Sequence, residues 1–189
     1  MLAGAMDTLV LGDPADPATD VGPVSDDAAY QRLMDYRATQ KANWVHTLDA
    51  TGMIVPPTII RLKSIDDITQ EWFGPILHVA TWKAGDLEAT VARINAKGFG
   101  LTMGLHSRIA RNAETVEALA NVGNLYVNRS MIGAIVGSQP FGGEGLSGTG
   151  PKAGGPHYLH RFCVERVTST DTTSAGGNAT LLSLNDVGL

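Results

Sequence analysis

Six glycines fall within fifteen residues at positions 136–150, in the stretch VGSQPFGGEGLSGTG. Gly143, Gly145 and Gly148 match the G-x-G-x-x-G pattern of dinucleotide-binding loops. Such a loop follows a strand and opens a helix, so that helix N–H groups face the pyrophosphate. Here residues 149–159 contain prolines and glycines that stop a helix, and the acidic residue about 20 positions on is Glu165, in a strand-like segment. The context therefore argues against a phosphate loop and favours tight turns with close backbone approach, although a purely structural loop also fits the composition.

Other residues whose side chains could take part in catalysis or binding are one cysteine, two histidines and an Asn-Arg pair. Cys163 alternates with apolar residues and lacks a flanking turn of small residues, so we expect a packed structural cysteine rather than a nucleophile. His157 and His160 are joined by no Cys, Asp or Glu at metal-ligand spacing, so we expect surface or interface histidines and no metal site. Asn128 and Arg129 follow a predicted strand, where a site-facing role and an ordinary hydrogen-bonding role both stay open.

The composition is that of a cytoplasmic globular chain. It has 189 residues, 43% of them hydrophobic, which is enough for one substantial core. The formal net charge is −5 and no basic run is present, so the composition argues against nucleic-acid binding. No apolar segment approaches the ~18 residues that span a bilayer. A single cysteine fits a reducing compartment.

The order of elements predicts an α/β layer with a mainly parallel sheet. Residues 1–12 are typical of the tail of an apolar helix or strand, and Ser25 is the expected N-cap of a helix over 27–42. Strands and helices then alternate, as in parallel α/β folds. The expected strands are 55–63, 76–84, 101–107 and 124–130, and the expected helices are 85–98, with Gly98 as its C′ residue, and 112–123.

Several motifs, in order, resemble the C-terminal half of an aldehyde dehydrogenase catalytic domain. They are QPFGGEGLSGTGPKAGG at 139–155 and QEWFGPILHVA at 70–80, supported by the stretches at 12–26, 94–108, 122–137 and 172–184. The sequence is most similar to Δ1-pyrroline-5-carboxylate (L-glutamate γ-semialdehyde) dehydrogenases, in particular the module found in bifunctional proline utilization A flavoenzymes. The resemblance implies a partial catalytic domain at 1–160, an oligomerisation strand at 161–175 and a tail at 176–189.

The same resemblance assigns site residues. In the family, the E-x-F-G-P motif lies beside the nicotinamide end of NAD, and here it reads Glu71 to Pro75. Glu71 would accept hydrogen bonds from the nicotinamide ribose hydroxyls, and Phe73 would pack near the ring. Backbone N–H groups of Gly133 and Ala134 would hold the substrate carboxylate as an anion nest, and Phe141 would wall its aliphatic chain.

The resemblance also implies that parts of the machinery are absent. The family's nucleophilic cysteine, its general-base glutamate and its NAD domain lie N-terminal to every motif present here, so we expect a catalytically inactive fragment of a longer enzyme. That enzyme would oxidise glutamate semialdehyde to glutamate with NAD. FAD would belong only to an upstream proline dehydrogenase domain.

Two alternatives remain. The chain could be a standalone assembly or regulatory module that docks to a full-length enzyme through the segment 161–173, because strand addition needs only exposed backbone donors and acceptors. It could also belong to an aldehyde dehydrogenase of other specificity, against which the glycine-rich motif argues. We expect the fragment, with its sheet incomplete at the N-terminal end, to expose apolar surface and to self-associate. The resemblance separately implies a homo-oligomer formed through the C-terminal strand.

Overall fold

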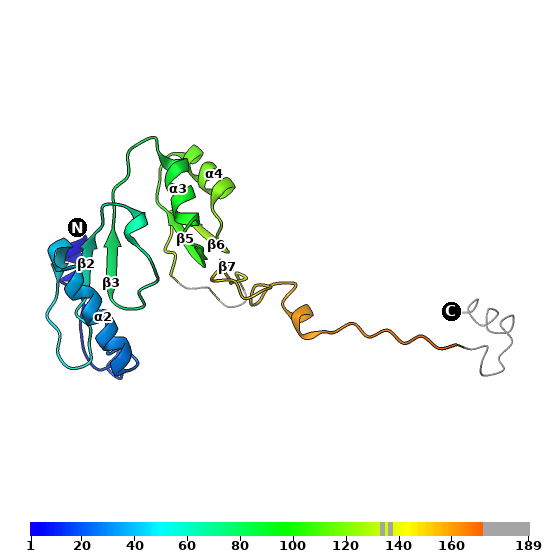
Figure 1. Cartoon of the computed structure of the whole chain (residues 1–189), viewed down its shortest axis with the longest axis horizontal. Coiled ribbons are helices and arrows are strands. Elements are labelled where there is room, and N and C mark those ends of the chain that lie inside the picture. The colour runs from blue at the N-terminus through cyan, green and yellow to red at the C-terminus, as the bar shows by residue number, and fades with distance from the viewer. Residues whose placement is uncertain (133–134, 136–137, 172–189) are drawn as a thin grey trace.

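The computed structural model describes residues 1–132, 135 and 138–171. Two neighbouring groups of elements are visible in Figure 1, one from the N-terminal part of the chain and one from its middle, followed by an extended segment. No helix among the described residues is long and apolar enough to cross a membrane.

The first group is a helix packed beside a three-stranded sheet. Its sheet has the order β1-β2-β3, with β1 antiparallel and β3 parallel to the central β2. Thr58, Ile59 and Ile60 of β2 are 1%, 2% and 0% exposed, so the central strand forms the core of this group. Its elements are α1 (Leu2–Met6), α2 (Asp27–Thr39), η1 (Lys41–Asn43), β1 (Trp44–Thr47), β2 (Thr58–Arg61), η2 (Ile65–Asp67) and β3 (Ile76–Val79).

Helix α2 begins at Asp27 as predicted and ends at Thr39, three residues before the predicted end, but its N-cap is not the predicted one. Asp26, not Ser25, is the N-cap, because the Asp26 carboxylate accepts a hydrogen bond from the backbone N–H of Ala29 at 2.7 Å. This bond is the main reason that the pKa of Asp26 lies below its ordinary value. Ser25 instead donates its hydroxyl to the Asp26 carboxylate at 3.2 Å. An aspartate is as good an N-cap as a serine, and the charged acceptor gives the stronger hydrogen bond.

The second group pairs two helices with two short sheets. β5 and β6 are parallel, with Thr102 opposite Asn124, whereas β4 and β7 are antiparallel. The helices are joined at their C-terminal ends, since Asn95 donates to the Leu119 carbonyl at 2.7 Å and accepts from the Asn121 N–H at 3.0 Å. The elements are α3 (Leu87–Asn95), β4 (Phe99–Gly100), β5 (Thr102–Leu105), α4 (Ala110–Leu119), β6 (Asn124–Val127) and β7 (Glu144–Gly145).

The α/β fold and the four predicted strands are confirmed, with differences in detail. The strands belong to separate small sheets rather than to one layer, and β1, which was not predicted, adds an antiparallel edge. Gly98 has a φ of +77° and marks the end of α3, but the C-cap is Ala96, so Gly98 lies one residue beyond the predicted C′ position. Helix α4 ends at Leu119, four residues before the predicted Gly123, because its C-cap Ala120 is already in the extended conformation, with ψ of 128°.

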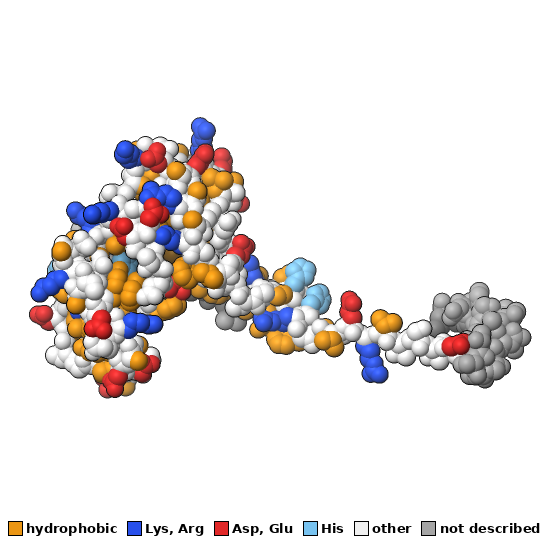
Figure 2. All heavy atoms as spheres, in the orientation of Figure 1, with side chains coloured by type: hydrophobic (Ala, Val, Ile, Leu, Met, Phe, Trp, Pro, Cys, Tyr) orange, Lys and Arg blue, Asp and Glu red, His pale blue; other side chains and the backbone are white. Residues whose placement is uncertain are grey.

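The C-terminal described segment contains one 3₁₀ turn, η3 (Leu159–Phe162), and no assigned strand over 163–171. Cys163 is exposed, so the prediction of a packed cysteine was wrong. Its thiol donates to the Leu159 carbonyl in the turn just before it, at 3.6 Å. Apolar side chains are visible along this extended segment in Figure 2. Phe162 and Val164 are among its exposed residues. A strand that pairs only with a neighbouring molecule does not form in a single chain, so the oligomerisation strand stays a prediction.

Candidate functional site

The E-W-F-G-P motif occupies the loop that enters β3. Ile76 donates its N–H to the Gly74 carbonyl at 2.8 Å, and the Pro75 carbonyl accepts from the Thr58 N–H at 3.0 Å. Because β2 and β3 are parallel, the motif lies at the edge where both strands begin. The sheet thereby fixes the C-terminal end of the motif.

Aromatic contacts fix the middle of the motif. The Trp72 indole stacks on the Tyr36 ring of α2, with centroids 3.7 Å apart and planes inclined by 11°. A hydrogen bond of 2.7 Å joins the Tyr36 hydroxyl to Nε2 of His78 on β3. Burial raises the pKa of Tyr36 and lowers that of His78 from their ordinary values, so both groups are held neutral.

Helix α2 also touches the motif one turn earlier. A side chain at Gly74 would place its Cβ 2.6 Å from Cδ1 of Leu33, which is fully buried, so the absence of a side chain there lets the loop approach the helix. Upstream, Lys97 donates to the carbonyls of Asp66 and Ile68 at 3.1 and 2.9 Å. The loop before the motif is therefore tied to the second group of elements.

With Trp72 held against α2, its two neighbours face outward. Phe73 is 73% exposed, and Glu71 is exposed as well. The Glu71 carboxylate makes no hydrogen bond or ion pair to any residue that the structure describes, and the Phe73 ring stacks on none of them. An unengaged carboxylate thus lies two residues from an unengaged aromatic ring on a fixed loop.

The glycine-rich loop is fastened to the second group by backbone contacts. β7 pairs with β4, and Phe141 exchanges two backbone hydrogen bonds with Ala153, of 3.0 and 2.9 Å. A side chain at Gly123 would overlap the Gly142 carbonyl oxygen, and Lys152 donates its ammonium to the Gly123 carbonyl. No α-helix follows the loop over 149–158, so the structure agrees with the argument against a dinucleotide phosphate loop.

The predicted site residues are not all brought together within the described part of the chain. Phe141 is half-buried beside Gly142, whereas Glu71 and Phe73 lie on the loop before β3. No hydrogen bond or ring contact between described residues joins Phe141 to that loop. Gly133 and Ala134 lie outside the described residues, so the anion nest stays a prediction.

Other candidate residues have structural contacts. Asn128, in the left-handed region with φ of +55°, bonds both backbone groups of Ser107 through its side-chain amide at 2.9 Å, which supports the ordinary hydrogen-bonding role. The Arg129 guanidinium lies 5.0 Å from the Tyr126 ring centroid. His157 and His160 are exposed, as predicted, and the described residues contain no cluster of three or more metal-binding side chains.

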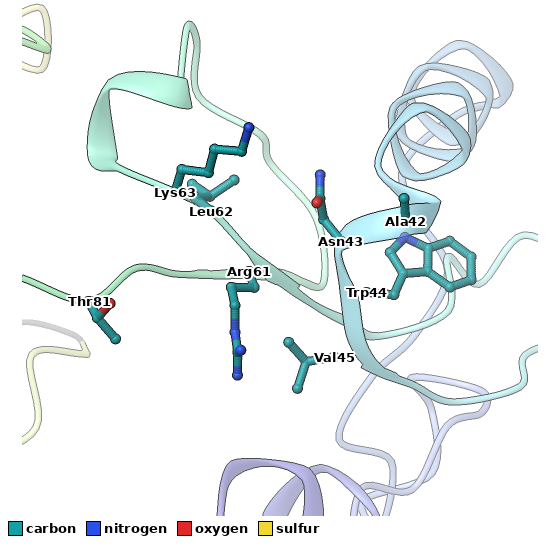
Figure 3. Close-up of a pocket in the computed structure, with 8 residues that line it drawn as sticks. All are labelled: Ala42, Asn43, Trp44, Val45, Arg61, Leu62, Lys63 and Thr81. Carbon is teal, nitrogen blue, oxygen red and sulfur yellow. The ribbon is translucent and has the colours of Figure 1, made fainter.

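A cavity of about 470 Å³ lies at the opposite edge of the first sheet (Figure 3). Its lining residues follow the ends of β2 and β3 or open β1: Ala42, Asn43, Trp44, Val45, Arg61, Leu62, Lys63 and Thr81. Arg61 and Val45 point to one side of the strand, and Lys63 points to the other. The two cationic groups therefore do not converge, and none of the predicted site residues lines this cavity.

Tyr36, His78 and Trp72 were not predicted as site residues. A usable signal was present, because aromatic residues make up only 6% of this chain, yet one occupies the variable position of the E-x-F-G-P motif. The partner on α2 could not be found from spacing, since Tyr36 and Trp72 are far apart in sequence.

Comparison with known proteins defines the class. The Aldehyde dehydrogenase family matches residues 1–168, and the chain belongs to this family. The fold agrees, since the chain superimposes on 1-pyrroline-5-carboxylate dehydrogenase from Thermus, solved with bound NAD, with a TM-score of 0.73 and 32% identity over 84% of this chain and 32% of that one.

Other relatives have a higher sequence identity to this chain. Bifunctional protein PutA of Klebsiella aerogenes is 47% identical over 178 residues, covering 88% of this chain and 14% of the relative. The 1-pyrroline-5-carboxylate dehydrogenase of Bacillus cytotoxicus is 39% identical over 168 residues, covering 85% and 32%. A crystal structure of a proline utilization A mutant from Bradyrhizobium japonicum matches 93% of this chain and 18% of that chain, with a TM-score of 0.83 and 50% identity. The chain thus spans about a seventh to a third of the length of the curated relatives that it matches.

Proposed function

We propose that this chain supplies the C-terminal part of the catalytic domain of an NAD-dependent L-glutamate γ-semialdehyde dehydrogenase, which oxidises the aldehyde to glutamate in proline catabolism. The observation that carries the proposal is the exposed pair Glu71 and Phe73 on a fixed loop, in a chain 39% to 47% identical to enzymes named for this reaction or for proline utilization.

The exposed residues fit the nicotinamide end of NAD. An ionised carboxylate only accepts hydrogen bonds, which suits the two hydroxyls of a ribose, and a flat aromatic face suits a flat heterocycle. Glu71 and Phe73 would hold the nicotinamide riboside, while the cofactor, when bound, accepts the hydride. The relative from Thermus that was solved with bound NAD supports this cofactor choice.

The substrate carboxylate is assigned to the glycine-rich region. Backbone N–H groups of Gly133 and Ala134 would bind it, and Phe141 would line the path of the aliphatic chain. The backbone bridge between Phe141 and Ala153 supports this role, because it fixes the backbone that carries the ring. We further propose that FAD, if used by a longer protein, binds outside these residues.

The chain is proposed to act within a longer enzyme and to be inactive by itself. A thiolate nucleophile is needed for the covalent route, and the exposed Cys163 lies in an extended segment, with no described residue placed to activate it. Oligomerisation through residues 161–175 is supported by the exposure of Val164 and Val167, which are 92% and 89% exposed. An assembly module would use the same segment.

The test is to express the complete reading frame that encodes these residues and to follow NAD reduction with glutamate semialdehyde and, for comparison, propanal. Preference for glutamate semialdehyde is expected, with loss of NAD affinity in Glu71→Ala and no loss in the control Glu88→Ala, at an exposed position on α3. A preference for propanal would contradict the substrate, unchanged NAD affinity in Glu71→Ala would contradict the cofactor site, and turnover by the 189-residue chain alone would contradict its proposed inactivity.

A further inference from the structure

We propose that Tyr36 is a positioning residue for the cofactor-binding loop, and that the Tyr36–Trp72 stack sets the direction of Glu71 and Phe73. The inference rests on the proposed function, because it concerns how the residues assigned to NAD are held. Tyr36 is far from both in the sequence, and its side-chain hydrogen bond and ring contacts are with His78 and Trp72. It acts through Trp72, the residue between Glu71 and Phe73.

The stack between Tyr36 and Trp72 requires that Trp72 point toward α2. The two rings are nearly parallel at a centroid distance of 3.7 Å, so rotating Trp72 outward would break the whole stack. Glu71 and Phe73 flank Trp72, and both are exposed whereas Trp72 is half-buried against Tyr36. As long as Trp72 faces α2, Glu71 and Phe73 must face away from it.

Tyr36 is fixed in turn from two directions. Its hydroxyl is joined to His78, on the strand that the motif enters. On the helix side, the neighbouring Arg37 donates from Nε to the Thr58 hydroxyl at 2.7 Å, which locks α2 against β2. Helix α2 lies alongside this sheet in Figure 1. The loop, the helix and the sheet therefore form one closed set of contacts around Trp72.

This arrangement stabilises the loop before any cofactor arrives. Preformed geometry reduces the ordering that binding would otherwise require. Removing the stack should leave the sheet and helix in place and free the segment 69–74 to adopt other directions. NAD binding should then weaken, while the rate of the chemical step should change little.

Three variants in the complete enzyme separate the effects. Tyr36→Leu removes the stack, Tyr36→Phe keeps the ring and removes the hydroxyl, and Tyr30→Leu is a matched loss of a tyrosine on the same helix, where Tyr30 has no ring contact with another described residue. We expect Tyr36→Leu to raise the KM for NAD roughly tenfold, within the hundredfold that a misplacement of about 1 Å can produce. The kcat should change less than about twofold, and Tyr36→Phe and Tyr30→Leu should keep a KM near that of the unchanged enzyme.

A readout without cofactor accompanies the kinetics. Limited proteolysis of the 189-residue chain with chymotrypsin should cut at Trp72 and Phe73 faster in Tyr36→Leu than in the unchanged chain, and not faster in Tyr36→Phe. If cleavage and the KM for NAD are both unchanged in Tyr36→Leu, or if kcat falls while KM stays constant, the positioning role is refuted. Failure of the proposed function is seen separately, because Glu71→Ala would then leave the KM for NAD unchanged whatever Tyr36→Leu does.

Discussion

Arg37 offers the sharpest test of what holds the first group of elements together. It is 4% exposed and has no carboxylate partner among the described residues. Nε donates to the Thr58 hydroxyl at 2.7 Å and a terminal nitrogen donates to the Thr47 hydroxyl at 3.0 Å, while the guanidinium lies 4.7 Å from the Trp44 ring centroid. Burial lowers the pKa of Arg37 from its ordinary value, so the charge itself opposes folding.

The magnitudes predict that removing the charge of Arg37 and removing its volume have different effects on the free energy of unfolding. Hydrogen bonds to a charged group contribute roughly 1.5–3 kcal/mol each, and the desolvation of a buried ion costs about several kcal/mol, so these effects nearly cancel. Both hydroxyls keep carbonyl partners without Arg37, because Thr58 donates to Pro56 and Thr47 to Pro57. Arg37→Met, which keeps the stem volume, should therefore change the free energy of unfolding by no more than about 1 kcal/mol. Arg37→Ala leaves a cavity and should lose about 2–4 kcal/mol, as large-to-small changes at buried sites do.

The assay is urea unfolding of the 189-residue chain, followed by tryptophan fluorescence, with equal slopes against urea concentration as the condition for comparing free energies. Arg32→Met, at an exposed position on the same helix, is the control and should stay within about 0.5 kcal/mol. If Arg37→Met is as destabilised as Arg37→Ala, the buried charge has a net stabilising role and the cancellation argued above is wrong.

Three further predictions concern the loop, the histidine and the exposed surface. Gly123→Ala should displace the glycine-rich loop, because its methyl group would overlap the Gly142 carbonyl. Limited proteolysis should therefore cut within 140–150 faster than in the control Gly4→Ala, where nothing lies within 4 Å of the added methyl group, and equal rates would refute the close packing. Burial lowers the pKa of His78 below its ordinary 6.5, so between these two values the unfolded chain binds more protons, and the free energy of unfolding should rise as pH increases through that interval. His78→Gln should remove this contribution, and an unaltered slope of stability against pH would contradict it. Because Leu159, Phe162 and Val167 are 75%, 69% and 89% exposed, the chain should self-associate in light scattering, and a monodisperse monomer over a range of concentrations would count against this.

The sequence determined those features that depend on neighbours along the chain. Short β-branched runs bounded by Pro or Gly predicted β2 and β3, and the alternation of strands and helices predicted β5 and β6. Gly98 marked the end of α3, because short-range sterics and hydrogen bonding decide such ends. The prolines and glycines after Gly148 argued correctly against a phosphate loop. The motifs identified the family, because their order and spacing can be read from the sequence even when the site is incomplete.

Contacts between distant residues decided the rest. Asp26 caps α2 in place of its neighbour Ser25. The unpredicted strand β1 is formed by antiparallel pairing with β2, a contact that its own sequence does not reveal. Cys163 was expected to be packed and is exposed, because burial depends on what lies opposite a segment and not on its own alternation.

The candidate site shows the same division. Sequence alone named Glu71 and Phe73, but only the folded chain brought Tyr36 onto Trp72 and thereby turned the flanking side chains outward. A stack between residues that far apart is specified by the packing of α2 on the sheet. That packing depends on the buried surfaces of Leu33, Arg37 and β2 together, which no local pattern encodes.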